Sequence, residues 1–138
     1  KKVPGLVVIN NYIERIANRC VYIDNVAGSK VLAEFLISNG HRKFACATSI
    51  YQNRDPEERL NGLKDVLDQK GFSMSSEAIV ESTANIRGGE NCVKQLLARK
   101  VDFTALVCYN DLMAVGAMNV GASPPGRGFY WPGGVEQG

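Results

Sequence analysis

The chain has 138 residues, of which 45% are hydrophobic and 22% are charged, and its formal net charge is +2. This composition is typical of a soluble globular protein, and the length is sufficient for one domain with a buried core. The small net charge and the absence of a lysine- and arginine-rich block argue against direct nucleic-acid binding. No apolar run approaches the ~20 residues of a membrane-spanning helix, and the short run after Lys1 and Lys2 does not resemble a signal peptide.

The four cysteines lie in separate apolar segments, at Cys20, Cys46, Cys92 and Cys108. None belongs to a C-x-x-C motif, and the single His41 cannot complete an ordinary zinc site with them. We therefore expect free, buried thiols in a reducing compartment, the cytoplasm, and no metal. The spacing does not support a Cys–His catalytic pair, so we interpret His41 as a structural residue that bonds nearby backbone.

Residues 1–40 alternate between short apolar runs and helical periodicity. Val31, Leu32, Phe35 and Leu36 predict the apolar stripe of a helix that stops at Asn39-Gly40. In chain order, the expected elements are a buried strand over Leu6–Ile9, a loop or short turn over Tyr12–Arg19, a strand over Cys20–Ile23 and a helix over Val26–Ser38.

The same alternation continues to Met118. Asp55, Pro56 and Glu58 predict a helix start with Asp55 as N-cap and Glu58 in a capping box. Gly88-Gly89 lacks the G-x-G-x-x-G spacing of a phosphate-binding loop, which favours tight helix packing and gives no indication of a nucleotide cofactor. The expected elements are a strand over Phe44–Thr48, a loop over Ser49–Arg54, a helix from Asp55 to Lys70-Gly71, a strand over Ala78–Val80, a loop over Ser82–Arg87, a helix over Glu90–Arg99, a strand over Ala105–Cys108 and a helix from near Leu112.

Strands that alternate with helices predict parallel strands joined by right-handed crossovers. The expected fold is therefore an α/β protein, a three-layer α/β/α sandwich around a mostly parallel sheet. Residues 119–138 break the pattern, because they contain six glycines, three prolines and no apolar periodicity. We expect this tail to be irregular or disordered, and the preceding helix to stop at Gly121 and Pro124-Pro125 after two to three turns.

Three polar residues are candidates for ligand binding. Asn10 and Asn110 follow predicted strands, and ligands of open α/β sheets bind at the carboxyl ends of the strands. The amide of Asn110 suits a sugar hydroxyl, although Asn110 or Asp111 could instead only cap the next helix. Arg59 falls near a helix N-terminus, where the dipole does not favour a cation, so it either forms a surface ion pair or holds a ligand. We find no catalytic base or nucleophile constellation and expect no enzyme.

Several motifs carry a family resemblance. Ala105–Met118 is similar to the AxNDxMAxGAM segment of the lactose/galactose repressor (LacI/GalR) family of bacterial transcription regulators. Further similar stretches are Pro4–Asn10, Asn18–Cys20, Asp24-Asn25 with Gly28, Asn39–His41, Glu58–Gly62 and Gly88–Glu90. In this order and spacing they make residues from about Val3 to Met118 resemble the effector-binding core of that family, closest to the galactose repressor and isorepressor. That core has two lobes like those of type I periplasmic binding proteins.

The resemblance implies an organisation and a function. Residues 1–11 would form the end of the first lobe, and residues 12–118 the second lobe. The matching positions imply that Arg59 and Asn110 contact a sugar effector and that Asn10 is a polar cleft residue. They imply a cytoplasmic, homodimeric, sugar-sensing repressor core without catalytic residues, with galactose as the leading effector. DNA would be bound only through a helix-turn-helix domain that this chain lacks.

The resemblance ends at Met118. The family continues with a GFDD-type strand whose aspartate binds sugar hydroxyls, whereas residues 119–138 read as unrelated sequence. A fragment with half of the site is expected to bind sugar weakly or not at all. The alternatives are a fragment of a periplasmic-type sugar-binding protein, or a small flavodoxin-like domain of unknown role.

Overall fold

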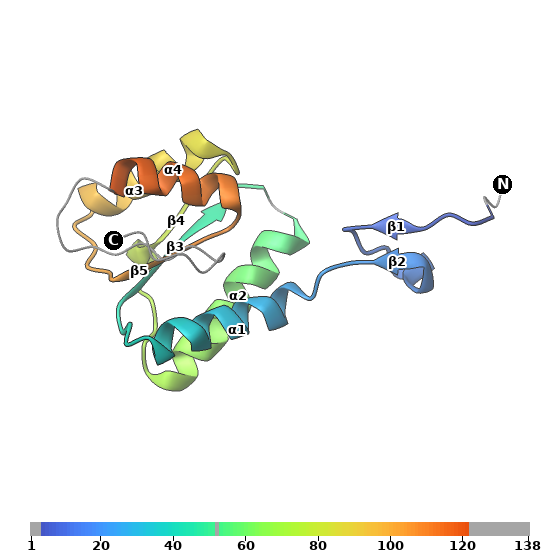
Figure 1. Ribbon diagram of the computed structural model, residues 1–138, viewed down its shortest axis with the longest axis horizontal. Helices are drawn as coiled ribbons and strands as arrows, with labels where there is room; N and C mark the ends of the chain where they lie inside the picture. Colours follow the sequence, from blue (N-terminus) through green and yellow to red (C-terminus); the bar gives the residue numbers. More distant parts are fainter. Residues whose placement is uncertain (1–3, 52, 122–138) are drawn as a thin grey trace.

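The computed structural model describes residues 4–51 and 53–121. It contains a three-stranded sheet with helices on both faces, and a two-stranded sheet that extends away from this body towards the N-terminus (Figure 1). The predicted fold class is confirmed, because the strands and helices alternate and every strand pair in the described ranges is parallel.

The larger sheet has the strand order β4-β3-β5. Its strands are β3 (Phe44–Ser49), β4 (Ile79–Ser82) and β5 (Ala105–Cys108), with Cys46 opposite Ile79 and Val107. All six residues of the central strand β3 are buried, as expected for a parallel strand covered on both faces. Successive β3 side chains therefore enter different cores.

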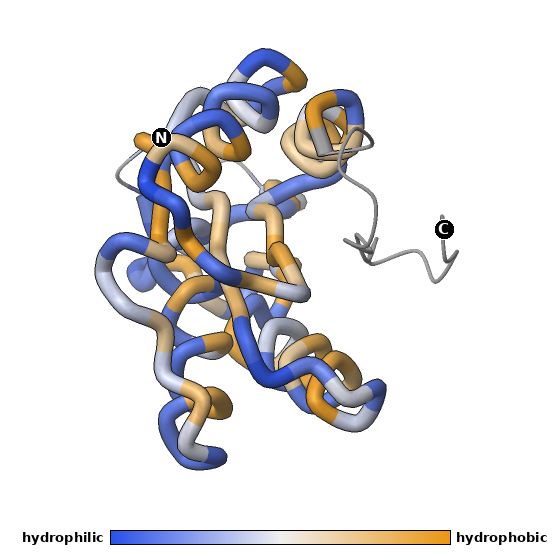
Figure 2. Tube along the Cα trace, turned by 90° about the vertical axis from the view of Figure 1, so that its left-hand side faces the viewer, coloured by the Kyte–Doolittle hydropathy of each residue, from blue (hydrophilic) through white to orange (hydrophobic). Residues whose placement is uncertain are grey.

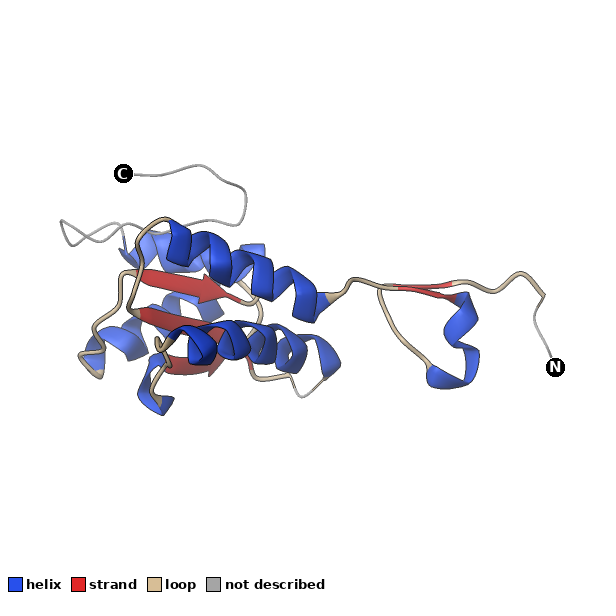
Figure 3. Cartoon of the chain, turned by 90° about the horizontal axis from the view of Figure 1, so that it is seen from below, coloured by secondary structure: helices blue, strands red, loops and turns tan. Residues whose placement is uncertain are grey.

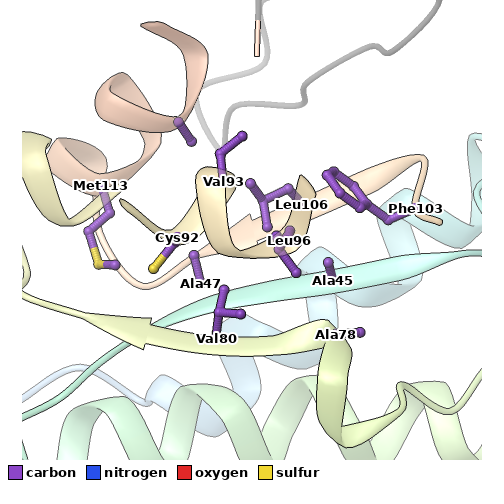
Figure 4. Packing of buried hydrophobic residues seen from close by; sticks show 11 residues of the cluster. Ala45, Ala47, Ala78, Val80, Cys92, Val93, Leu96, Phe103, Leu106 and Met113 are labelled. Atoms are coloured by element: carbon purple, nitrogen blue, oxygen red, sulfur yellow. The ribbon is translucent and has the colours of Figure 1, made fainter. Parts of the chain in front are cut away.

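Two helix pairs sandwich this sheet (Figure 3). The pair α1 (Asn25–Ser38) and α2 (Arg54–Lys70) packs on the face that carries Phe44 and Cys46. The pair α3 (Ile86–Ala98) and α4 (Asp111–Gly121) covers Ala45 and Ala47, with Val93, Leu96 and Met113 in the core (Figure 4). The outer helices alternate between hydrophilic and hydrophobic segments, as expected for amphipathic helices (Figure 2).

The smaller sheet pairs β1 (Val8–Ile9) with β2 (Cys20–Val21). The predicted buried strand over Leu6–Ile9 is wrong in length and in burial, because Ile9 is 71% exposed. Among the described residues, no helix pair packs on this sheet as α1–α2 and α3–α4 pack on β3. Its β-branched residues Ile9 and Val21 are therefore exposed. The short 3₁₀ helices are η1 (Glu14–Arg19), where a loop or turn was expected, and η2 (Ser76–Ala78).

Two helices begin earlier than predicted. The cap of α2 is Asn53, whose side chain accepts a bond from the Asp55 N–H at 3.2 Å, so Asp55 is not the N-cap and the predicted capping box is wrong. Helix α3 starts at Ile86, not near Glu90, and the Asn85 side chain accepts from the Gly88 N–H at 2.8 Å. Glycine has low helix propensity, but tertiary packing places both glycines inside α3.

The apolar stripe predicted for α1 is partly wrong. Val31 and Phe35 are 66% and 47% exposed, whereas Ala33 and Leu36 are buried against α2 and β3. At the other end of the chain, α4 includes residues 119–121, which were expected to be irregular. The rest of the predicted tail lies outside the described residues. None of the helices in the described ranges is both long and apolar enough to cross a bilayer.

Candidate functional site

A hollow lined by polar and apolar side chains lies where β3 and β5 end. We call it the large pocket; its volume is about 490 Å³, and it is lined by the start of α1, the second turn of α2 and the β5–α4 junction, including Asn25, Arg59 and Asn110. A second hollow of about 150 Å³, the small pocket, adjoins it and includes Asn10, Asn25 and Arg59. Ile23, Asn25 and Arg59 line both pockets, so they form the wall between them.

Arg59 is half-buried in that wall. Its Nε donates to Oδ1 of Asn25 at 2.9 Å, and its Nη1 donates to the carbonyl oxygen of Tyr109 at 2.5 Å. The guanidinium carbon also lies 4.9 Å from the centre of the Tyr109 ring. Nη2 makes no hydrogen bond to the described residues, so an arginine that is already fixed in orientation retains donors for a ligand.

Asn110 is the N-cap of α4. Its Oδ1 accepts a bond from the Met113 N–H at 2.9 Å, and its Nδ2 donates to the carbonyl oxygen of Ala84 at 3.2 Å. Of the two caps that the sequence allowed, Asn110 therefore takes the role. An amide has two donor hydrogens and two acceptor lone pairs, so the cap leaves capacity for a ligand in the large pocket.

Asn10 lies on the other side of Arg59. It follows β1 with a left-handed backbone φ of 58°, and its N–H donates to the carbonyl oxygen of Val21 at 2.7 Å. It lines the small pocket but not the large one. The structure thus brings Arg59 together with each of the other two candidates, and it places Asn10 and Asn110 in different pockets.

Asn25, the first residue of α1, is not among the site residues predicted from the sequence. Its side chain is buried, with the residue 7% exposed, and its Nδ2 donates to Asp55 Oδ1 at 3.1 Å and to Glu58 Oε2 at 3.3 Å. The signal that could have revealed it is the polar pair Asp24-Asn25 directly after a strand, which repeats the pattern of Asn10-Asn11.

An aromatic cluster that the sequence did not predict connects the smaller sheet to α2. The Arg54 guanidinium lies over the rings of Tyr12 and Tyr22, at 4.5 and 5.3 Å from their centres. The two rings meet edge to face at 5.1 Å, and Arg54 also forms an ion pair with Glu58. Glu58 holds the pKa of the Arg54 guanidinium above its usual range. The small pocket is therefore bordered by segments next to the smaller sheet and by the starts of α1 and α2.

The comparison with known families decides where this chain belongs. Residues 7–138 match the sequence profile of the family described as periplasmic binding proteins and the sugar-binding domain of the LacI family. The chain belongs to this family. The resemblance predicted from the motifs is confirmed, although the profile continues beyond Met118, where that resemblance ended.

Individual relatives give the same result. The chain is 36% identical over 120 residues to the HTH-type transcriptional regulator GalR of Escherichia coli, covering 87% of this chain and 35% of that protein. It is 35% identical over 117 residues to GalS of Salmonella typhimurium, covering 85% of this chain and 34% of that protein. A solved sugar-binding transcriptional regulator of the LacI family from Escherichia coli, complexed with phosphate, superposes with a TM-score of 0.81 at 30% identity, covering 89% of this chain and 46% of that one. The chain thus spans about a third of the length of the curated relatives.

The thiols contribute apolar surface. Burial raises the pKa of Cys46 to about 12 and that of Cys92 to about 11, and it also raises the pKa of Cys108. Cys46 and Cys108 line the large pocket as neutral groups. Across the described ranges, no three His, Cys, Asp or Glu side chains form a group suited to a metal ion.

His41 lies before the start of β3, whereas the large pocket lies where β3 ends. Its Nδ1 is 2.9 Å from the Thr104 hydroxyl, and its backbone N–H donates to the carbonyl oxygen of Leu36 at 3.1 Å. Burial lowers the pKa of its ring. The predicted structural role agrees with these contacts, which include a side-chain hydroxyl.

Proposed function

We propose that this chain is part of the sugar-sensing core of a LacI/GalR-type transcriptional regulator and has no catalytic activity. The observation that carries the proposal is the position of Arg59, which is fixed between two pockets at the carboxyl edge of the sheet and retains free donors. Family membership supports it, and the relatives reported above are named as transcriptional regulators.

Sugar hydroxyls would be held by the three predicted residues. Arg59 would donate from Nη2 to one or two hydroxyl oxygens, while Asn110 would offer its remaining donor and acceptor from the large pocket. Asn10 would contribute from the small pocket, as a polar residue of the segment assigned to the first lobe. The resemblance to galactose regulators makes D-galactose the first sugar to test.

The test is calorimetric titration of the chain with D-galactose. We expect weak, saturable binding that disappears in Arg59→Ala and persists in Arg87→Ala, because Arg87 is exposed on α3 away from both pockets. Circular dichroism establishes that each variant is folded. Absence of binding by the folded wild-type chain would contradict the proposal that this segment holds a usable sugar site.

In the whole regulator, the sugar would shift the relative position of the two lobes and so change the affinity for DNA, which a helix-turn-helix domain would contact. We place this regulator in the cytoplasm, in line with four cysteines that are free in the structure. The name of the family also covers periplasmic binding proteins, but the relatives reported above are regulators.

We also propose that the chain self-associates. Leu6, Val7 and Ile9 are exposed next to a two-residue β1 strand, and such an apolar strand edge favours pairing with another chain. We expect light scattering to give the mass of a dimer or a larger assembly. A monomer mass that does not depend on concentration would contradict this.

A further inference from the structure

We infer that Asn25 is the positioning residue for Arg59, and that it keeps the guanidinium available to the ligand by separating it from Asp55 and Glu58. This inference rests on the proposed sugar site. It assigns to the start of α1 a role that the sequence motifs did not indicate.

The contacts of Asn25 match the polarity of its surroundings atom by atom. The amide oxygen faces a cation, since Oδ1 accepts from Arg59 Nε at 2.9 Å. The amide nitrogen faces two anions, since Nδ2 donates to Asp55 Oδ1 at 3.1 Å and to Glu58 Oε2 at 3.3 Å. A neutral side chain that is 7% exposed thereby lies between charges of opposite sign, and an aspartate or a hydrophobic residue could not satisfy both sides.

The arrangement prevents a competing ion pair. Asp55 lies four positions before Arg59 on α2, a spacing at which a helix commonly forms carboxylate–arginine pairs, and Glu58 directly precedes Arg59. Among the described residues, however, the partner of Glu58 is Arg54, and Arg59 forms no ion pair. The amide nitrogen of Asn25 bonds both carboxylates. Among the described residues, the Arg59 guanidinium therefore has no carboxylate partner.

The arrangement also fixes the direction of Arg59. Bonds from Nε to Asn25 and from Nη1 to the Tyr109 carbonyl oxygen hold the guanidinium plane at two points. A side chain that is ordered before binding loses less conformational entropy when the ligand arrives. If Asn25 is removed, Arg59 is expected to turn towards Asp55 and Glu58 and to lose its orientation towards the large pocket.

The first arm of the test needs no sugar. The Nε–Hε signal of Arg59 is followed by ¹H–¹⁵N NMR in the full chain and assigned by its loss in Arg59→Lys. Asn25→Ala is expected to speed exchange of this proton with water by about tenfold or more, since a bond to a charged group is lost. Asn91→Ala, at an exposed position of α3, is the matched control and should leave the rate unchanged. An unchanged rate in Asn25→Ala overturns the inference.

A second variant covers the case in which Asn25→Ala fails to fold. Asn25→Asp retains the shape and an acceptor for Nε but loses the donor to Asp55 and Glu58. We expect Hε protection close to that of the wild type, because the acceptor at position 25 is what holds Arg59. Loss of protection in Asn25→Asp would overturn the inference.

The second arm uses D-galactose as the probe in a double-mutant cycle. Asn25→Ala is expected to weaken binding by about tenfold when Arg59 is present and to have little further effect in the Arg59→Lys background, where binding is weaker but still measurable. An equal loss in both backgrounds would show a general structural role and overturn the inference. If the wild-type chain does not bind galactose, the proposal that this segment holds a usable sugar site fails, whereas the NMR arm still decides the role of Asn25.

Discussion

Gly89 of α3 lies directly against the backbone of Met113 in α4. A Cβ at position 89 would lie 2.0 Å from the Met113 carbonyl oxygen, and one at Gly116 would lie 1.9 Å from that of Ile86. The two helices therefore approach each other through glycines from both sides. The tight helix packing predicted from Gly88-Gly89 is confirmed, and it brings the start of α4, where Asn110 lies, next to the start of α3.

Gly89→Ala is expected to lower the free energy of unfolding by about 1–3 kcal/mol, because the helices must move apart to accept the methyl group. The measurement is urea denaturation followed by circular dichroism. Gly28→Ala is the matched control, since a Cβ there meets nothing within 4 Å. In that exposed helical position, alanine should raise the free energy of unfolding by about 0.5–1 kcal/mol. Equal effects of the two substitutions would contradict the role of Gly89 in packing.

Substitutions of Asn110 should separate its capping role from a ligand role. Asn110→Ala removes the bond to the Met113 N–H and should cost about 1 kcal/mol of unfolding free energy. Asn110→Asp preserves the cap and loses only the bond to the Ala84 carbonyl oxygen, so it should be the more stable of the two. Both should weaken galactose binding. Wild-type affinity in Asn110→Asp would show that the amide nitrogen does not contact the sugar.

Arg59→Lys should weaken galactose binding about tenfold although the charge is retained. A single ammonium cannot bond Asn25 and the Tyr109 carbonyl oxygen and still present a planar pair of donors to a ligand. Calorimetric titration measures the affinity, with Arg87→Lys as the control. Unchanged affinity would mean that charge alone matters at position 59.

Arg54→Ala should loosen the smaller sheet. Removal of the guanidinium that lies over the Tyr12 and Tyr22 rings deletes two cation–π contacts. Amide hydrogen exchange should therefore speed several-fold over residues 12–23 and stay unchanged in β3. Equal acceleration in β3 would indicate global destabilisation and contradict a local role.

The buried thiols should make the chain sensitive to alkali. The pKa of Cys46 is about 12 and that of Cys92 about 11 in the folded chain, against 9.0 for an unperturbed thiol. Above pH 9 the unfolded chain therefore loses protons that the folded chain retains, so the free energy of unfolding falls as pH rises. The slope is about 1.36 kcal/mol per pH unit for each thiol, from pH 9 to its folded pKa. Urea titrations at pH 8, 9 and 10 measure it.

Cys46→Ala is the control for that experiment. The variant starts from a lower free energy of unfolding but should show a shallower decline between pH 9 and 10, because one of the thiols with a raised pKa is gone. A decline identical to that of the wild type would show that the ionisation of Cys46 is not linked to folding.

The sequence was sufficient for the fold class and for the order of elements from β3 to α4. Apolar runs such as Ala105–Cys108 and periodic stretches such as Leu60–Leu67 carry their own burial pattern, since both faces of a central parallel strand and one face of each helix must be apolar. The sequence also indicated that Asn10, Arg59 and Asn110 lie near the carboxyl ends of strands. Parallel strands bring these ends to one edge of the sheet.

Only the tertiary structure decided which polar residues meet. Asn25 reads as an ordinary helix start, and its burial depends on Asp55, Glu58 and Arg59, which are thirty or more positions away in the chain. The start of α3 and the exposure of Val31 and Ile9 were decided in the same way, by what packs against each segment. Local sequence determines the propensity and periodicity of an element, whereas burial and pairing of a side chain depend on contacts between elements that are distant in sequence.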